Sequence, residues 1–180
     1  GMLADFGYMF ECPDLFKLGD QDILIFSPQG IEASGMKYQN VYQAGYVSGH
    51  FDSAAGTFEH GDFEELDRGF DFYAPQTTVD DKGRRILFAW MSVPDQNEQD
   101  HPTIEHKWLH TMTLPRELKL VNGKVIQVPL EELRNIRAGE AIEHKVVLDK
   151  ESRELNGVNG KAFELEIGDL SLSEGWFDLS

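Results

Sequence analysis

The chain has 180 residues, of which 41% are hydrophobic and 11% aromatic, so it can bury a core and is expected to be globular. Its 32 acidic and 16 basic residues give a formal net charge of -16 at pH 7. This charge argues against nucleic acid and membrane surfaces as partners, because both are bound through basic patches. A single cysteine, Cys12, cannot form an internal disulfide, which favours a reducing compartment and predicts a cytoplasmic protein.

Three apolar runs that end in turn residues predict β-strands. They are 23–26, 41–47 and 86–91. The runs 23–26 and 86–91 are continuous rather than alternating, which predicts that they are buried on both faces.

Two turn sequences predict antiparallel hairpins. Residues 80–83, Asp-Asp-Lys-Gly, separate two short apolar segments, and Gly83 is free to adopt a positive φ. Asn122-Gly123 suits a type I′ turn between two further strands. The chain up to Val128 is therefore predicted to be mainly antiparallel β.

A short helix is predicted after this β region. Leu130, Leu133 and Ile136 are three residues apart, and the glutamates precede the arginines as the helix dipole prefers. We expect about two turns of helix over 129–137 and a domain boundary near residue 137. Short strands are then predicted at 145–148, 162–167 and 170–172.

Glu11 is the best candidate for chemistry. The apolar residues 8–10 before it would partly desolvate its carboxyl, which favours the neutral form that a general acid needs at neutral pH. Pro13 removes a backbone donor and biases Cys12 towards an extended backbone, so the support should be rigid and non-helical. A surface glutamate near the start of a strand would fit the same spacing.

Six segments of the chain, in the same order, resemble motifs of family 32 of the glycoside hydrolases, which includes invertases, sucrose-6-phosphate hydrolases, inulinases and levanases. The similarity runs from about residue 5 to about residue 137. The segments are DFGYMFECPDLFKL (5 to 18), SPQG (27 to 30), KYQNVYQAGYVSGHFD (37 to 52), FEELDRGFDFYAPQT (63 to 77), GRRILFAWM (83 to 91) and TLPRELKL (113 to 120).

This resemblance implies an all-β fold made of parts of two domains. Residues 2–128 would form the last blades of a five-bladed β-propeller with a funnel-shaped active site on its axis. Residues 129–137 would form a helical linker, and 138–180 the first strands of an incomplete β-sandwich.

The resemblance also implies a chemistry. Glu11 matches the general acid/base of a retaining β-fructofuranosidase, in which a second carboxylate about 5 Å away attacks the fructosyl carbon. Tyr73, Trp90 and Cys12 match substrate-binding positions, and an aromatic face suits a sugar C–H surface. Trp90 would equally fit a core residue of an apolar strand. No cofactor or metal is implied, and the implied partner is a fructoside.

The chain departs from the family pattern in its nucleophile. The family places this aspartate in an Asn-Asp-Pro block and a substrate-gripping aspartate in an Arg-Asp-Pro block, and neither tripeptide occurs in the sequence. We therefore expect a fragment of an enzyme that cannot hydrolyse a fructoside alone. The alternative is a non-catalytic propeller remnant that binds sugar or self-associates through exposed strand edges.

Two further groups of residues have open interpretations. Asp67, Arg68 and Asp71 fit either a wall of the sugar pocket or a solvated loop with an internal ion pair. His101, His106 and His110 are separated by five and four residues, which is not a recognised metal-ligand spacing, so we expect them to be structural or exposed.

Overall fold

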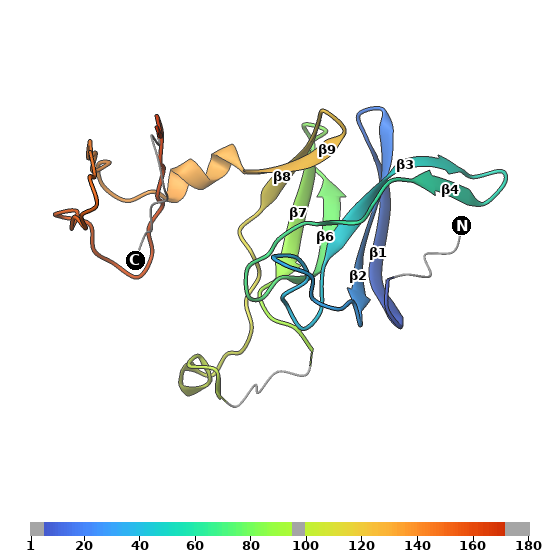
Figure 1. The fold of residues 1–180 in the computed structure, drawn as a ribbon, viewed down its shortest axis with the longest axis horizontal. Helices are drawn as coiled ribbons and strands as arrows, with labels where there is room; N and C mark the ends of the chain where they lie inside the picture. The colour runs from blue at the N-terminus through green and yellow to red at the C-terminus, as the bar shows by residue number, and fades with distance from the viewer. Residues whose placement is uncertain (1–5, 95–99, 172–180) are drawn as a thin grey trace. The chain divides into compact units, whose positions relative to one another are not determined.

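The structure, a computed structural model, describes residues 6–94 and 100–171. The chain divides into two compact units, the first ending at Ile136 and the second beginning at Arg137. Within the described residues, every strand belongs to the first unit, where the strands form two antiparallel sheets (Figure 1). The predicted all-β class is confirmed.

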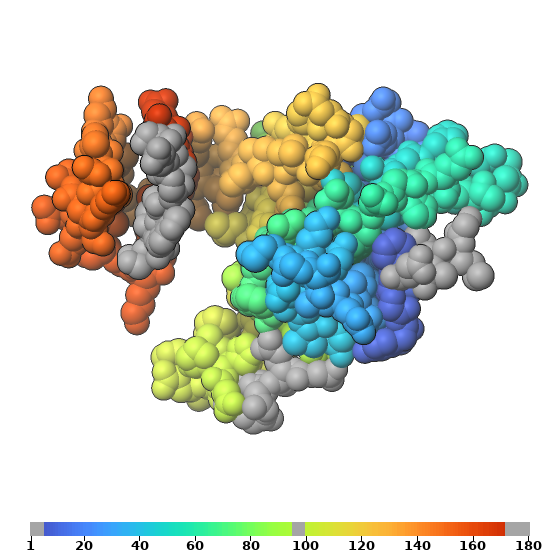
Figure 2. Space-filling model, viewed as in Figure 1, coloured from blue at the N-terminus to red at the C-terminus, as the bar shows by residue number. Residues whose placement is uncertain are grey.

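The first sheet is a meander with the order β1-β2-β3-β4, and a short strand, β5, also pairs with β3. Figure 2 shows the β3–β4 hairpin projecting from the body of this unit. The strands are β1 (Met9–Leu18), β2 (Gln21–Gln29), β3 (Gly45–Asp52), β4 (Thr57–His60) and β5 (Glu64–Glu65).

The second sheet is a meander with the order β6-β7-β8-β9, made of β6 (Tyr73–Val79), β7 (Arg85–Trp90), β8 (Arg116–Val121) and β9 (Lys124–Pro129). Both predicted hairpins are confirmed. Gly83 has φ 78°, and Asn122 and Gly123 have φ 51° and 76°. Positive φ at both central residues is what a type I′ turn requires.

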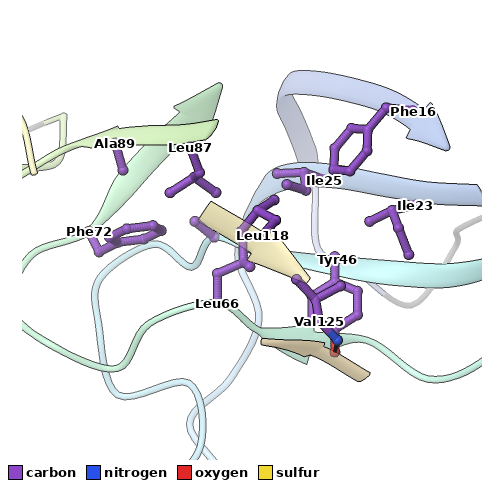
Figure 3. Packing of buried hydrophobic residues seen from close by; sticks show 11 residues of the cluster. Phe16, Ile23, Ile25, Tyr46, Leu66, Phe72, Leu87, Ala89, Leu118 and Val125 are labelled. Carbon is purple, nitrogen blue, oxygen red and sulfur yellow. Dashed lines mark hydrogen bonds between the residues drawn. The ribbon is translucent and has the colours of Figure 1, made fainter. Parts of the chain in front are cut away.

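The main core lies between the facing sides of the two sheets. Figure 3 shows Phe16, Ile23 and Ile25 of the first sheet pointing towards Leu87 and Leu118 of the second, and all five are buried. Burying one such side chain contributes about 1.5–3 kcal/mol. A hydrogen bond crosses the same interface, because the Val125 amide donates to the Tyr46 hydroxyl at 3.1 Å. The sheets are thus fixed against each other, which positions the residues at their junction.

Two strand predictions need correction. The third strand begins at Gly45 rather than at Val41, whose side chain is 64% exposed. Residues 23–26 are largely buried, but in 86–91 Phe88 and Met91 are 38% and 48% exposed. Leu87 and Ala89 point into the main core, whereas on the opposite face of β7 Ile86 is buried and Phe88 is exposed, so β7 is only partly buried on that face.

The helix after β9 forms, but it is a 3₁₀ helix. It spans η3 (Glu131–Ile136), and the Leu133 amide donates to the Leu130 carbonyl at 3.0 Å, the i to i+3 spacing of that helix. Pro129 ends β9 instead of starting the helix.

The strands expected at 145–148 and 162–167 are not formed, and residue 172 of the third lies outside the described residues. Within 137–171 these segments have no strand partner, and an isolated strand leaves its backbone groups unpaired. Within this unit Arg137 forms an ion pair with Glu164.

Candidate active site

A β-bulge places Glu11 at the junction of the two sheets. Glu11 lies opposite Ser27 and Asp14 opposite Ile25, so β1 has one extra residue between these pairs. Ser27 and Ile25 are two residues apart, so the bulge puts Glu11 and Asp14 on the same face. That is the face that packs on the second sheet.

The backbone of Cys12 differs from the expected one. A residue before proline is biased towards extended geometry, but Cys12 has φ 49°, in the left-handed region. The bulge accounts for the difference, because its inserted residue must turn the strand. The expectation of an extended Cys12 was therefore wrong.

A second bulge places Tyr73. Tyr73 lies opposite Trp90 and Gln76 opposite Phe88, again with one extra residue. Ala74, at this bulge, has φ 48° and precedes Pro75, as Cys12 precedes Pro13. Tyr73 is 1% exposed, and its hydroxyl is directed at Glu11.

Glu11, Tyr73 and Gln29 form a hydrogen-bonded triad. The Tyr73 hydroxyl donates to Glu11 Oε2 at 2.9 Å, and Gln29 Nε2 donates to the same oxygen at 3.3 Å. Gln29 Nε2 also donates to the Tyr73 hydroxyl at 2.9 Å. Burial, and next the bond to Glu11 and its charge, hold the pKa of Tyr73 well above its usual value, although the bond from Gln29 opposes this. Tyr73 therefore stays a neutral donor to the carboxylate.

An aromatic wall continues from the triad. The rings of Tyr42 and Trp90 lie 5.9 Å and 6.5 Å from that of Tyr73, and His110 lies 4.8 Å from Trp90. Trp90 is only half-buried, and its indole N–H has no acceptor among the described residues. Trp90 therefore presents a partly exposed ring beside the triad, while its indole N–H is covered by neighbouring atoms.

Cys12 is partly exposed next to Glu11. Burial, and then the negative charge of Glu11, raise the pKa of its thiol. Its carbonyl accepts a hydrogen bond from Gln76 Nε2 at 3.0 Å, so its backbone is tied to β6. Because its pKa is raised, the thiol of Cys12 is protonated at neutral pH.

The other candidate residues lie in ion pairs or on a loop. Asp67 accepts a hydrogen bond from Arg116 at 2.7 Å, and Arg68 forms an ion pair with Glu65 at 3.3 Å. Neither Arg116 nor Glu65 belongs to the group of Asp67, Arg68 and Asp71 considered from the sequence. His101 and His110 have ring centroids 6.0 Å apart. Among the described residues, no group of three or more His, Cys, Asp or Glu is arranged to hold a metal.

A hollow of about 210 Å³ lies away from Glu11. Its lining includes Leu15 and Leu24, whose neighbours in β1 and β2 point to the core, so it belongs to the opposite face of the first sheet. Its further lining residues are Phe51, Gly56, Thr57, Phe58 and His60, which include no carboxylate.

Comparison with known proteins decides the family. The model of the glycosyl hydrolases family 32 N-terminal domain matches residues 2–129. The chain belongs to glycoside hydrolase family 32. The resemblance carried by the six sequence motifs is confirmed.

The curated relatives of the chain include sucrose-6-phosphate hydrolases. That of Bacillus subtilis (strain 168) is 62% identical over 138 residues, which cover 77% of this chain and 29% of the relative. That of Staphylococcus xylosus is 46% identical over 165 residues, covering 92% and 33%. The chain thus spans about a third or less of the length of these relatives.

Solved family 32 structures share the fold. The β-fructofuranosidase of Bombyx mori has a TM-score of 0.69 and 41% identity over 76% of this chain and 29% of its own. The sucrose-6-phosphate hydrolase of Lactobacillus gasseri has a TM-score of 0.65 and 30% identity over 74% and 27%. None of the helices in the described part of the chain has the length and hydrophobicity that a bilayer crossing requires.

The structure brings together Glu11, Tyr73 and Trp90, with Cys12 beside them, and adds a residue that the sequence did not single out. Gln29 lies in the SPQG segment, but its contact with Glu11 is made by pairing β1 with β2. Gln29 lies opposite Met9 and two residues after Ser27, which lies opposite Glu11. Pairing these two strands from the sequence would have placed Gln29 on the same face as Glu11.

Proposed function

We propose that this chain supplies the acid/base glutamate, Glu11, of a retaining β-fructofuranosidase that hydrolyses sucrose, sucrose 6-phosphate or short fructans. The observation that carries the proposal is the hydrogen bond from the buried Tyr73 hydroxyl to Glu11. Sucrose-6-phosphate hydrolases among the relatives support a phosphorylated substrate. A sucrose complex of the Bombyx mori enzyme supports the sucrose class.

Glu11 would act twice in this reaction. It first donates a proton to the glycosidic oxygen as the bond to the fructosyl carbon breaks, and a second carboxylate bonds to that carbon. Glu11 then accepts a proton from a water molecule whose oxygen bonds to the fructosyl carbon, the bond between that carbon and the second carboxylate breaks, and fructose is released. Both hydrogen bonds from Tyr73 and Gln29 go to Oε2, so we assign the proton transfer to Oε1.

Tyr73 and Gln29 would stabilise the anion that Glu11 becomes after donating its proton. A hydrogen bond to a charged carboxylate is stronger than one to its neutral form. Trp90 would hold the sugar by its ring face, and Cys12 would line the same side. The nucleophile would come from an Asn-Asp-Pro block, which this sequence does not contain.

We further propose that the two four-stranded meanders are blades of a five-bladed propeller. Residues 129–137 would be the linker and 138–180 part of a β-sandwich. The cytoplasm suits a phosphorylated substrate delivered by a sugar transporter. A second candidate is a non-catalytic propeller remnant that binds sugar or pairs with a second copy through the outer strands of its sheets.

A chimera tests the enzymatic proposal. Residues 5–137 would replace the matching segment of the Bacillus subtilis sucrose-6-phosphate hydrolase, which is 62% identical to this chain over 138 residues. We expect the chimera to hydrolyse sucrose 6-phosphate, and Glu11→Gln to reduce kcat at least 10²-fold, the scale of general acid catalysis.

The isolated chain serves as the comparison. We expect it to release no fructose from sucrose or sucrose 6-phosphate, because it lacks the family's nucleophile block. A folded chimera whose activity is unaffected by Glu11→Gln would reject the assigned role. Activity of the isolated chain that is lost in Glu11→Gln would mean that a second carboxylate in this sequence acts as nucleophile.

A further inference from the structure

Strands β1 and β6 belong to different sheets, yet their bulges are joined by side chains. Asp14 Oδ2 accepts from the Thr77 amide at 2.9 Å and from the Thr77 hydroxyl at 2.6 Å. Asp14 lies directly after the Cys12-Pro13 bulge and Thr77 just after the Ala74-Pro75 bulge. One carboxylate oxygen thus connects the two irregular segments.

The hydrogen bonds between Asp14 and Thr77 are strong. A hydroxyl that donates to a carboxylate at 2.5–2.7 Å is a charge-assisted bond, roughly twice as strong as a neutral one. Arg85 Nη1 in turn donates to the Thr77 hydroxyl oxygen at 3.2 Å, and its guanidinium lies 4.4 Å from the centre of the Phe16 ring. Asp14 and Thr77 are both partly buried, so solvent screens the link only in part.

Both bulges need hydrogen bonds from outside their own strand pair to fix their backbone. Pro13 and Pro75 have no N–H, so neither can be fixed by a ladder hydrogen bond of its own. Two further bonds run from β6 to the first sheet, one to the bulge of β1 and one to β2. Gln76 Nε2 donates to the Cys12 carbonyl at 3.0 Å, and the Ala74 amide donates to the Ser27 hydroxyl at 3.2 Å.

We propose that Asp14 is a positioning residue, which holds the Tyr73 hydroxyl at hydrogen-bond distance from Glu11 by locking one bulge against the other. Glu11 is three residues before Asp14 and Tyr73 four before Thr77, so a slip between β1 and β6 would separate the acid from its donor. That this matters for catalysis rests on the proposed function, whereas the geometric claim does not.

The test is a double-mutant cycle on the 180-residue chain, read by carbon-13 NMR of the Glu11 carboxyl. The signal is assigned by its loss in Glu11→Gln. Tyr73→Phe removes the donor and should shift the signal in the native background. In Asp14→Ala, the same substitution should shift it by less than half as much, because the donor is already displaced.

Thr77→Val and Thr77→Ser provide a milder pair. Valine keeps the shape but loses the hydroxyl, so the Tyr73→Phe effect should shrink, whereas serine keeps the hydroxyl and should preserve the effect. This pair decides the question if Asp14→Ala does not fold. Asp22→Ala is the matched control, because Asp22 accepts from the Phe51 amide at 3.0 Å on the same sheet without contacting β6.

Each outcome of the cycle either supports or overturns the positioning role of Asp14. A Tyr73→Phe effect of the same size in Asp14→Ala or Thr77→Val as in the native chain would overturn the proposal, and so would an equal loss in Asp22→Ala. If the cycle behaves as expected while the chimera shows no Glu11-dependent hydrolysis, the positioning role stands and the proposed function fails. The reverse result rejects only the role of Asp14.

Discussion

Cys12 is the residue where the bulge, the proline and the carboxylate meet. Its φ of 49° would be unusual for any residue other than glycine, and here it turns Glu11 towards the second sheet. The same geometry puts the thiol beside the Glu11 carboxylate, whose charge contributes to the raised thiol pKa. As the sole cysteine, Cys12 is also a probe of this charge.

Glu11→Gln should therefore increase the reactivity of Cys12. Removing the negative charge favours the thiolate, so the thiol pKa falls, although the larger effect of burial remains. We expect the rate of alkylation by iodoacetamide at pH 8 to rise about two- to fivefold, because a pKa change of one unit is worth tenfold in thiolate. The pH profile of the rate measures the midpoint directly.

Asp20→Asn is the control for this measurement. It removes one negative charge from the turn between β1 and β2, at the opposite end of β1 from Cys12. It should leave the midpoint unchanged, since surface charges beyond about 10 Å are screened at 0.1 M salt. Equal shifts in both variants would mean that the thiol senses net charge rather than Glu11.

Motif resemblance named Glu11, Tyr73, Trp90 and Cys12, but the sequence alone could not predict how they meet. Tyr73 lies 62 residues from Glu11, and its contact depends on two sheets packing face to face. The Asp14 link to Thr77 spans 63 residues and was missed for the same reason. Contacts of this kind arise from tertiary packing, which local spacing does not encode.

At the scale of elements, the hairpin turns were predicted because their signals are local. Asn122-Gly123 and Asp80 to Gly83 specify their own backbone angles. The start of β3 was not predicted. Val41 and Tyr42 have apolar character, but the segment bonds irregularly, with the Gln43 amide donating to the Pro28 carbonyl. The limits of a strand follow from its partner strand, which an apolar run alone does not specify.

Gly49→Ala should destabilise the β3–β4 pairing. A Cβ at Gly49 would collide with the Glu59 carbonyl oxygen of β4, so the backbone must move. Overpacking of this kind costs about 1–3 kcal/mol. The free energy of unfolding, measured by urea titration, should fall by at least the lower value.

Gly83→Ala is the comparison for that variant. Gly83 has open space around its Cβ position but a φ of 78°, so only backbone strain applies. That strain costs about 1–2 kcal/mol. Amide exchange separates the two: Gly49→Ala should deprotect β3 and β4, and Gly83→Ala the β6–β7 turn. The same protection pattern in both variants would contradict the steric account.

At the scale of the whole molecule, two features oppose each other. The outer strands β4 and β9 present edges that can pair with another chain, and the net charge of -16 repels a second copy. Repulsion between exposed charges is screened by salt, with a Debye length of about 30 Å at 0.01 M and about 3 Å at 1 M. Association should therefore depend on ionic strength.

We expect light scattering after size exclusion to give a mass near 20.4 kDa at low salt and a higher mass at high salt. Ile126→Lys, on β9, should keep the chain monomeric, because a lysine on an edge strand opposes pairing. Phe88→Lys makes a similar change on the inner strand β7 and should have a smaller effect. If both lysines suppress association equally, loss of exposed apolar surface and added charge explain it, and edge pairing does not.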